Sequence, residues 1–362
     1  MLLGNLKSGR AVPADPTDEF WHAATLWILG ALIAVAVALS AWQYGGQFLH
    51  WDWMLISGLI VFFGGAIAAH ALPGRLERLV LTLAAADVIV GKPDAVEQLL
   101  VDLRAERRHW KQVAGLGAAL AIALAFVATT LQAGAPSLVA LGIVETIIAY
   151  PAGRYLGAMA HVGFLHRQLD RYGLRAVARP GLADQTGGLR AIGDLYFVQA
   201  TVVSLPAAYL ASWLLLIVLS GFFDARYGYW APAYSGLLAI ALVFVILAFF
   251  LPLWSFHRDM ASQKARYVEQ SLAARGRMHQ LRDALMASEN LEEEQRLMRE
   301  IDLLARKLRE IEALPTWPIA PSTRRRFTLN NTVLACPLLV QLFSEIGIGA
   351  SWLTWLRSHL GS

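Results

Sequence analysis

The stretch ETIIAYPAGRYLGAMAH, from Glu145 to His161, carries residues that could do chemistry inside an otherwise apolar segment. Glu145 falls near the middle of the predicted membrane depth, where a lone carboxylate must be protonated, paired or in contact with a water-filled cavity. We therefore expect Glu145 either to line an ion or substrate path or to be a neutral hydrogen-bonding group between helices. Arg154 and His161 fall near the predicted inner boundary, where long side chains reach the headgroups without any further function.

The same stretch gives little support for catalysis. Glu145 and His161 form the only plausible acid–base pair, and they lie about 24 Å apart along a helix, which is too far for them to act together. The motifs HExxH, GxSxG and DxDxDG and the Rossmann fingerprint do not occur. The single cysteine, Cys336, excludes an intrachain disulfide and a CxxC site. We expect no catalytic residue, no metal site and no cofactor.

Small residues in this stretch predict close helix packing. Ala149, Gly153, Gly157 and His161 recur every four residues, so they share one helix face, and GRYLG is a GxxxG step. Small side chains let two helix backbones approach closely in lipid. We interpret Gly153 and Gly157 as helix-packing residues.

Other polar residues fall inside apolar segments that contain proline. Gln199 precedes Pro206, while Asn331, Gln341 and Glu345 surround Pro337. Prolines free backbone carbonyls, and interrupted helices are common at ion and substrate sites in membranes. Together with Glu145, these four polar residues are the candidates for a pore or a substrate site, although helices that merely bend have the same pattern.

The elements that must position these residues are membrane-spanning helices. Of 362 residues, 57% are hydrophobic and 16% are charged, whereas soluble domains average about 25% charged residues. The apolar residues gather in runs of about 20, the length that crosses a bilayer. Seven segments are predicted, at about 22–43, 53–72, 112–133, 137–161, 194–222, 231–254 and 327–345. The seventh is polar enough to be re-entrant, so the sequence predicts an all-α, polytopic helical membrane protein with six or seven spans.

The basic residues give the orientation. Nearly all of the 31 Lys and Arg residues fall in the N-terminal segment and in alternate loops, at 73–111, 162–193 and 255–326. Cytoplasmic loops carry such an excess of positive charge. We therefore expect a multi-pass protein of the cell (inner) membrane with a cytoplasmic N-terminus.

These observations divide the chain into six parts. They are a cytoplasmic N-terminal segment (1–21), spans one and two (22–72), cytoplasmic amphipathic helices (73–111), spans three to six (112–254), a cytoplasmic coiled-coil hairpin with its linker (255–326), and span seven with a C-terminal tail (327–362). Within 73–111, Gly91 is predicted to end one helix, and Pro93 and Asp94 to start the next.

The hairpin follows from a heptad pattern. Leu297, Ile301, Leu304, Leu308 and Ile311 alternate in steps of four and three, as at the a and d positions of a coiled coil. A second apolar seam contains Met278, Leu281 and Leu285. Asn290 is typical of a helix N-cap, with Glu293 as its capping-box partner. We expect an antiparallel pair of helices with a turn near 287–290.

The loop segment GLADQTGGLRAIGDLYF, residues 181–197, reads as a tight turn into the start of a helix. It resembles a segment of uncharacterised bacterial multi-pass membrane proteins with the form His-Pro-Asp-x-x-Gly-Gly-Leu-x-x-Leu-Gly. The matching residues are Asp184, Gly187, Gly188, Leu189 and Gly193. Leu182 and Ala183 replace the His and Pro of that form, and Ile192 replaces a Leu. The resemblance implies a shared fold and no particular activity.

Several functions are compatible with this organisation. The first is an oligomeric ion channel or a membrane effector, regulated by the cytoplasmic hairpin. The alternatives are a secondary transporter, and a membrane scaffold or signalling protein that binds a partner through residues 255–313. The expected partners are the lipid bilayer and further copies of the chain. Nucleic acid is not expected, because the basic residues of the hairpin alternate with Glu and Asp as on a solvated helix face.

Overall fold

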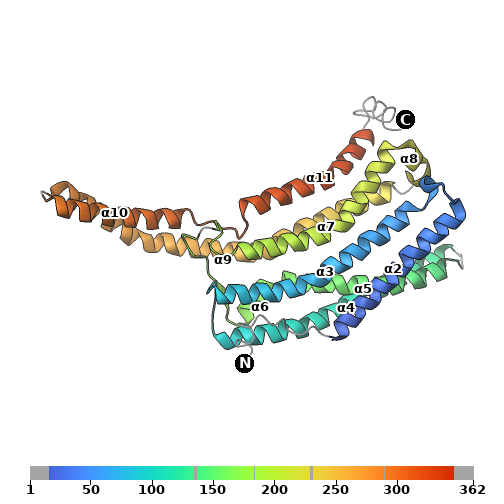
Figure 1. Cartoon of the computed structure of the whole chain (residues 1–362), viewed down its shortest axis with the longest axis horizontal. Coiled ribbons are helices and arrows are strands. Elements are labelled where there is room, and N and C mark those ends of the chain that lie inside the picture. The colour runs from blue at the N-terminus through green and yellow to red at the C-terminus, as the bar shows by residue number, and fades with distance from the viewer. Residues whose placement is uncertain (1–15, 134–136, 183, 229–230, 289, 346–362) are drawn as a thin grey trace.

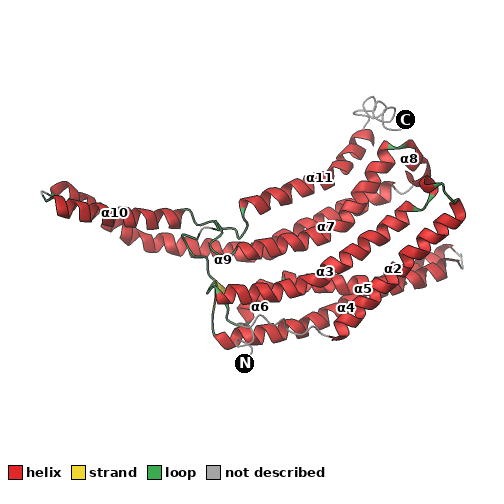
Figure 2. Ribbon diagram, viewed as in Figure 1, coloured by secondary structure: helices red, strands yellow, loops and turns green. Residues whose placement is uncertain are grey.

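The structure is a computed structural model, and it describes residues 16–133, 137–182, 184–228, 231–288 and 290–345. These residues form an all-α fold with ten α-helices, as expected for the class (Figure 2). The helices are α2 (Pro16–Tyr44), α3 (Trp53–Ala85), α4 (Pro93–Ala133), α5 (Ser137–Gly163), α6 (Leu165–Arg171), α7 (Arg190–Leu219), α8 (Gly221–Tyr227), α9 (Ala231–Ala287), α10 (Leu291–Glu312) and α11 (Pro321–Glu345). A short 3₁₀ helix, η1 (Phe48–His50), and two strands, β1 (Ile89–Val90) and β2 (Arg175–Ala176), complete the described part.

Four helices are long and apolar enough to cross a membrane, over Asp18–Tyr44, Trp53–Ala85, Arg190–Leu219 and Tyr234–Ala287. An α-helix is stable in the hydrocarbon core of a membrane, because its backbone N–H and C=O groups form hydrogen bonds within the helix. Four predicted spans, at 22–43, 53–72, 194–222 and 231–254, fall largely on these helices. The remaining predicted spans, at 112–133, 137–161 and 327–345, fall on α4, α5 and α11. When only the described residues are considered, these three helices are not among the four candidate membrane spans.

The long helices form one elongated bundle (Figure 1). Helices α2, α3, α4 and α5 make one group, and α7, α9 and α11 make another. Helix α3 packs against α2, α5 and α7, so it joins the two groups. The main core is a set of buried apolar side chains that includes Leu72, Leu76, Tyr196 and Phe249.

Helices α3 and α4 both extend beyond their predicted spans. Helix α3 continues through Pro73 to Ala85, because buried Leu76, Leu79, Val80 and Leu83 keep helical spacing past the apolar run. The 73–111 region is therefore made from the end of α3 and the start of α4, rather than from separate surface helices. Helix α3 ends six residues before Gly91, whereas α4 starts at Pro93 as predicted.

Helix α7 begins and ends earlier in the sequence than its predicted span. It ends at Leu219 and is followed by the short helix α8, because Ser220 adopts an extended conformation between them. The predicted end at residue 222 therefore lies just under one helical turn beyond the observed end.

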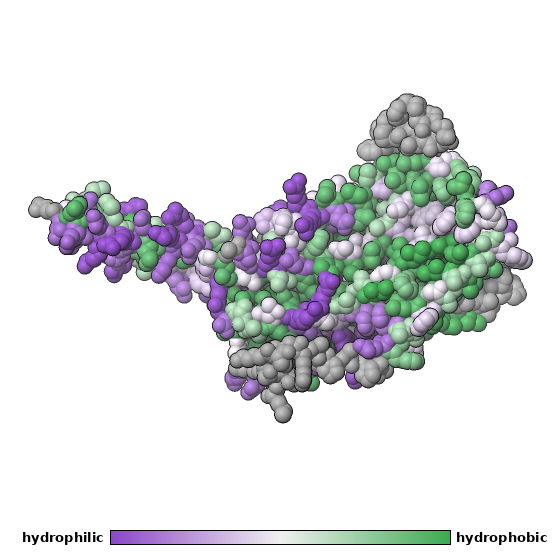
Figure 3. All heavy atoms as spheres, viewed as in Figure 1, coloured by the Kyte–Doolittle hydropathy of each residue, from purple (hydrophilic) through white to green (hydrophobic). Residues whose placement is uncertain are grey.

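Helix α9 continues out of the bundle as one uninterrupted helix, and α10 returns along it (Figure 1). Hydrophilic residues dominate the surface of this pair, in contrast to the apolar bundle (Figure 3). Leu297 and Leu308, at positions of the predicted heptad seam, and Leu281, in the second predicted seam, are buried in this pair of helices. The Asn290 side chain caps α10 by accepting a 3.0 Å hydrogen bond from the amide of Glu292, whereas Glu293 is exposed.

Candidate functional site

Helices α4 and α5 pack closely against each other. Gly153 and Gly157 lie in this contact. A Cβ at Gly153 would be 2.3 Å from the carbonyl oxygen of Ala114, and one at Gly157 would be 2.3 Å from that of Trp110. Any side chain would force the helices apart, so these glycines let the charged parts of α4 and α5 meet.

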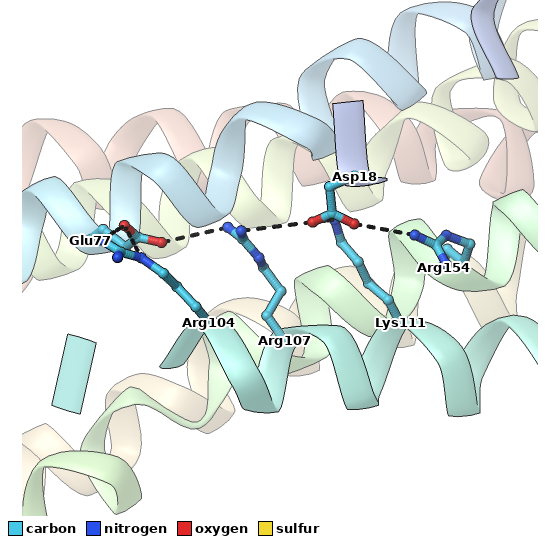
Figure 4. A network of polar contacts seen from close by, with 6 residues as sticks. All are labelled: Asp18, Glu77, Arg104, Arg107, Lys111 and Arg154. Atoms are coloured by element: carbon cyan, nitrogen blue, oxygen red, sulfur yellow. Dashed lines mark hydrogen bonds and ion pairs between the residues drawn. The ribbon is translucent and has the colours of Figure 1, made fainter. Parts of the chain in front are cut away.

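Six charged residues from four helices meet beside this contact (Figure 4). We call them the ionic cluster: Asp18 of α2, Glu77 of α3, Arg104, Arg107 and Lys111 of α4, and Arg154 of α5. The three basic residues of α4 project from one face, since they are three and four positions apart. Packing of α2, α3 and α5 around that face brings the two carboxylates to them.

Asp18 is the centre of the ionic cluster. Its carboxylate lies 2.8 Å from Lys111 Nζ, 3.2 Å from Arg154 Nη2 and 3.7 Å from Arg107 Nη2. The side chains of Asp18 and Lys111 are each 9% exposed. Buried charges are tolerated only when they are paired and hydrogen-bonded, because desolvation is costly. Asp18 therefore compensates three cations at once.

Glu77 completes the cluster on the side of α3. Its carboxylate lies 3.0 Å from Arg104 Nη2 and 3.6 Å from Arg107 Nη1. Arg107 thus bridges the two carboxylates, as Figure 4 shows. The cluster has four basic and two acidic side chains, so it carries an excess of positive charge. The buried Nε of Arg107 has no hydrogen-bond partner among the described residues.

Two histidines continue the polar region from the cluster. The rings of His22 and His70 stack with centroids 3.8 Å apart and planes within 3°. His22 Nδ1 lies 2.8 Å from the hydroxyl of Tyr155. A cavity of about 20 Å³ lies between these residues and the pair Asp18–Lys111, which is room for about one water molecule. Imidazole, phenol, carboxylate and ammonium groups around a water could pass a proton.

The described residues contain no group of His, Cys, Asp and Glu suited to hold a metal ion.

Two residues of the opening stretch lie elsewhere than expected. Arg154 does not extend to the headgroups: its side chain is 13% exposed and paired with Asp18. His161 is buried rather than at an interface, with Nδ1 3.3 Å from Gln168 Nε2. Both expectations fail for the same reason, because helices α2, α4 and α6 cover surfaces that a single span would leave to lipid. Glu145 lies within α5, but its side chain is outside the described residues.

The other candidates for a pore or substrate site occupy separate helix contacts. Gln199 of α7 is buried and donates a 3.2 Å hydrogen bond to the carbonyl of Met159 in α5. Asn331 donates within its own helix, to Phe327 at 2.9 Å. Gln341 of α11 accepts a 2.6 Å hydrogen bond from the hydroxyl of Ser235 in α9. The side chains of Gln199, Asn331 and Gln341 therefore do not meet in one site. The side chain of Glu345 is not among those that the structure describes.

Sequence reasoning missed Asp18, Lys111, His22 and His70. Asp18 was assigned to the cytoplasmic N-terminal segment, and Lys111 to a loop. One signal could have found them: basic residues at 104, 107 and 111 share one face of a helix that leads directly into an apolar run. Such a face needs carboxylates from neighbouring helices, and Asp18 at the start of the first apolar helix is a natural source.

A second polar region fixes the base of the hairpin to the bundle. Gln263 of α9 makes two 2.8 Å hydrogen bonds to β2 and its flank, accepting from the amide of Ala178 and donating to the carbonyl of Ala176. Strand β2 pairs with β1, which lies in the turn between α3 and α4. We call this chain of contacts, from Gln263 through β2 to β1, the hairpin junction.

The end of α10 and the segment after it are bonded to α9 close to Gln263. Lys264 Nζ donates to the carbonyls of Glu312 and Leu314, at 2.9 and 2.7 Å. His257 Nδ1 lies 2.8 Å from the carbonyl of Thr316. A Cβ at Gly193 would be 2.1 Å from the carbonyl of Pro318, so the segment after α10 presses directly on the start of α7. Both arms of the hairpin are therefore tied to the bundle.

The loop before α7 is held by Asp184. Its carboxylate accepts hydrogen bonds from the hydroxyl of Thr186 at 2.6 Å and from the amide of Gly188 at 2.9 Å. Gly187 and Gly188 have φ of +65° and +90°, which favour glycine, so the tight-turn interpretation is correct. Partial burial opposes ionisation of Asp184, but the hydrogen bonds from Thr186 and Gly188 outweigh it and lower the pKa of the carboxyl.

No protein-family model, curated protein or solved structure matches this chain.

Proposed function

We propose that this chain is a multi-pass membrane effector in which the α9–α10 hairpin regulates the packing of the membrane bundle. The observation that carries the proposal is the hairpin junction. Because Gln263 is bonded to β2 and β2 pairs with β1, a displacement of the hairpin is transmitted to the turn that joins α3 and α4.

The two helices joined by this turn, α3 and α4, both contribute residues to the ionic cluster. Glu77 lies on α3 within the last three turns before it, and Arg104, Arg107 and Lys111 lie on α4 after it. A change in the angle between α3 and α4 alters the distances on which the cluster depends. Closely packed helices and ion pairs are the kind of contiguous structure through which coupling travels. The hairpin is thus the input of this effector and the cluster is its responsive part.

The membrane placement belongs to the same proposal. Seven helices, α2, α3, α4, α5, α7, α9 and α11, cross the bilayer with alternating direction, and the hairpin lies in the cytoplasm. The basic residues of the hairpin and of the loops beside the junction support this side, by the excess of positive charge that cytoplasmic segments carry.

Cysteine labelling in intact cells tests the placement. In a Cys336→Ser background, a cysteine replacing Gly46, in the turn after α2, should react with a membrane-impermeant maleimide. A cysteine replacing Met286, which is 88% exposed near the tip of the hairpin, should react only after the cells are opened. Labelling at position 286 from outside intact cells would contradict the proposal.

A second candidate function is an ion channel, formed by one or more copies of the chain. The specific observation in its favour is the ionic cluster, because buried charges next to stacked histidines and a water-sized cavity are typical of ion and proton pathways. No described feature favours a secondary transporter over these two functions.

Flux into proteoliposomes separates the two candidates. For a channel, purified protein should dissipate an ion or proton gradient faster than protein-free vesicles do. Asp18→Asn and Glu145→Gln should each change the rate or the ion preference, whereas Glu19→Gln, an exposed neighbour of Asp18, should not. No flux above the protein-free rate, with and without the hairpin tip, would remove the channel and leave the effector.

A further inference from the structure

The first half of α11 has a groove that neither the ionic cluster nor the hairpin junction uses. It has a volume of about 540 Å³ and is lined by residues that include Arg324, Arg325, Thr328 and Leu329. The opposite face of α11 is the packed one, where Thr323 and Phe327 are buried against the bundle. The groove is therefore on the outer surface of the molecule.

The charges of the groove are uncompensated within the described part of the chain. Arg324, Arg325 and the adjacent Arg326 are all exposed, and none of them forms an ion pair there. By contrast, arginines of the hairpin such as Arg275 and Arg277 pair with carboxylates of α10. Three successive arginines without carboxylate partners can pair with an anion from outside the chain, because guanidinium groups form charge-assisted hydrogen bonds to anionic oxygens.

Aromatic contacts place the groove at the boundary of the apolar bundle. The ring of Phe327 stacks on that of Phe249 in α9, with centroids 4.1 Å apart. One to two turns further along α9, Trp254 contacts Trp317, with centroids 5.9 Å apart. Tryptophans prefer the membrane–water boundary. Arg324 and Arg325 precede Phe327 by less than one turn, so they lie between the apolar level and the tryptophan level.

An exposed apolar strip continues from the arginines toward the middle of the bundle. Leu329 and Val333 are 64% and 63% exposed on α11. They are four positions apart, so they lie on one face, about one helical turn from each other. The arrangement of charge at the boundary and apolar side chains deeper along the helix corresponds to the headgroup and acyl chain of a lipid.

We propose that this groove binds an anionic phospholipid. Its phosphate pairs with Arg324 and Arg325 and accepts a hydrogen bond from Thr328, while an acyl chain lies on Leu329 and Val333. A zwitterionic lipid is disfavoured because its fixed cation would lie beside uncompensated arginines. The inference rests on the membrane placement in the proposed function and adds a ligand to it.

The only cysteine of the chain provides a probe. Cys336 is exposed on α11, one turn beyond Thr332. An environment-sensitive fluorophore attached there is quenched by brominated acyl chains nearby. We would reconstitute the full chain into phosphatidylcholine vesicles that contain increasing fractions of brominated phosphatidylglycerol or, in parallel, brominated phosphatidylcholine.

The wild type should reach half-maximal quenching at a lower fraction of brominated phosphatidylglycerol than of brominated phosphatidylcholine. Each arginine near an anionic lipid strengthens binding by about fivefold, so the double variant Arg324→Gln/Arg325→Gln should lose most of this preference. The matched control, Arg282→Gln/Arg306→Gln, removes two exposed arginines of the hairpin and should keep it.

The outcomes separate the two proposals. Equal quenching by both lipids in the wild type, or a preference that survives the Arg324/Arg325 substitutions, would overturn the lipid site and leave the membrane placement intact. Absence of quenching by either lipid would show that α11 does not lie in the bilayer, and would overturn the site together with that part of the placement.

Discussion

Asp18 is the carboxylate that pairs with three buried cations in the ionic cluster. Among the described residues it is the only carboxylate paired with Lys111 and Arg154, and it shares Arg107 with Glu77. Removing one member of a buried charge network is more damaging than replacing the whole network, because the remaining charges stay buried without compensation.

We predict that Asp18→Asn lowers the free energy of unfolding by about 3 kcal/mol, since three cations lose their shared counter-ion. Titration with a denaturing detergent, followed by circular dichroism, measures this. Glu19→Gln is the matched control, because Glu19 is adjacent and exposed, and it should change stability by less than about 0.5 kcal/mol. Equal effects of the two substitutions would show that Asp18 is not compensating the buried cations.

Asp184 gives a prediction about pH. Its folded-state pKa is lowered from the ordinary value of 3.8, so its contribution to stability is fully present above about pH 4 and is lost as pH falls through the folded-state pKa. The wild type should therefore be more stable than Asp184→Asn at pH 7, and the difference should shrink toward pH 3. Thermal unfolding in detergent at several pH values measures it.

Asp302→Asn, on the exposed surface of α10, is the control for general effects of acid. A gap between wild type and Asp184→Asn that stays constant from pH 7 to pH 3 would show that the hydrogen bonds to Thr186 and Gly188 do not depend on ionisation.

Glu145 and Asp18 differ in how far the sequence alone could identify them as candidate site residues. Depth along one helix marked Glu145 as a candidate, because depth depends only on the local apolar run. The same reasoning assigned Arg154 to the headgroups, since nothing local indicates that Asp18, 136 positions away, is its partner. Ion pairs between helices depend on tertiary packing, which the spacing of one segment does not contain.

At the scale of elements, the α4–α5 contact holds the ionic cluster together. Gly157 has a backbone carbonyl 2.3 Å from where its Cβ would lie, whereas a Cβ at Gly117 of α4 would meet nothing within 4 Å. The two glycines therefore form a matched pair for the same substitution.

We predict that Gly157→Leu destabilises the protein by about 2 kcal/mol or more, because the side chain overpacks the contact and pushes α5 from α4. Gly117→Leu should be close to neutral. Detergent denaturation of both variants measures this. If Gly117→Leu were the more damaging substitution, the face of α4 that packs against α5 would have to be reassigned.

The hairpin offers a similar pair of positions on α10. Leu308 is buried against α9, whereas Leu303 is 55% exposed. We predict that Leu308→Asp separates the two helices, since an unpaired charge in the seam costs several kcal/mol, and that Leu303→Asp does not. Limited proteolysis near 288–290 in the full-length protein measures the separation. If the two variants were equally resistant to proteolysis, the observed packing of α10 on α9 through Leu308 would be contradicted.

Element boundaries were predictable where local chemistry sets them. Pro93 starts α4, Asn290 caps α10, and the heptad spacing places the seam of the hairpin. The end of α3 was not predictable from hydropathy, because the helix continues on buried leucines and Val80 after the apolar run stops at Pro73. Likewise, nothing in 73–111 indicates that β1 pairs with β2, since the two strands are distant in sequence and only two residues long.

At the scale of the whole molecule, a hydrophilic hairpin adjoins an apolar bundle (Figure 3). Polar contacts made by His257, Gln263 and Lys264 tie the base of the hairpin to the bundle. Helix α9 belongs to both parts, and Gln263 lies where it leaves the bundle. Regulation by the hairpin therefore requires that the hairpin junction couples the hairpin to the turn between α3 and α4.

Hydrogen exchange of the full-length protein in nanodiscs, followed by mass spectrometry, tests this coupling most directly. The variant is Gln263→Ala, and the control is Gln280→Ala, an exposed glutamine further along the same helix. We predict that Gln263→Ala speeds amide exchange at residues 174–180, which contain the hydrogen-bond partners of Gln263. Exchange should also speed up at residues 86–92, to which Gln263 is not hydrogen-bonded. Gln280→Ala should leave both segments unchanged. Faster exchange at 174–180 with no change at 86–92 would contradict transmission through the junction.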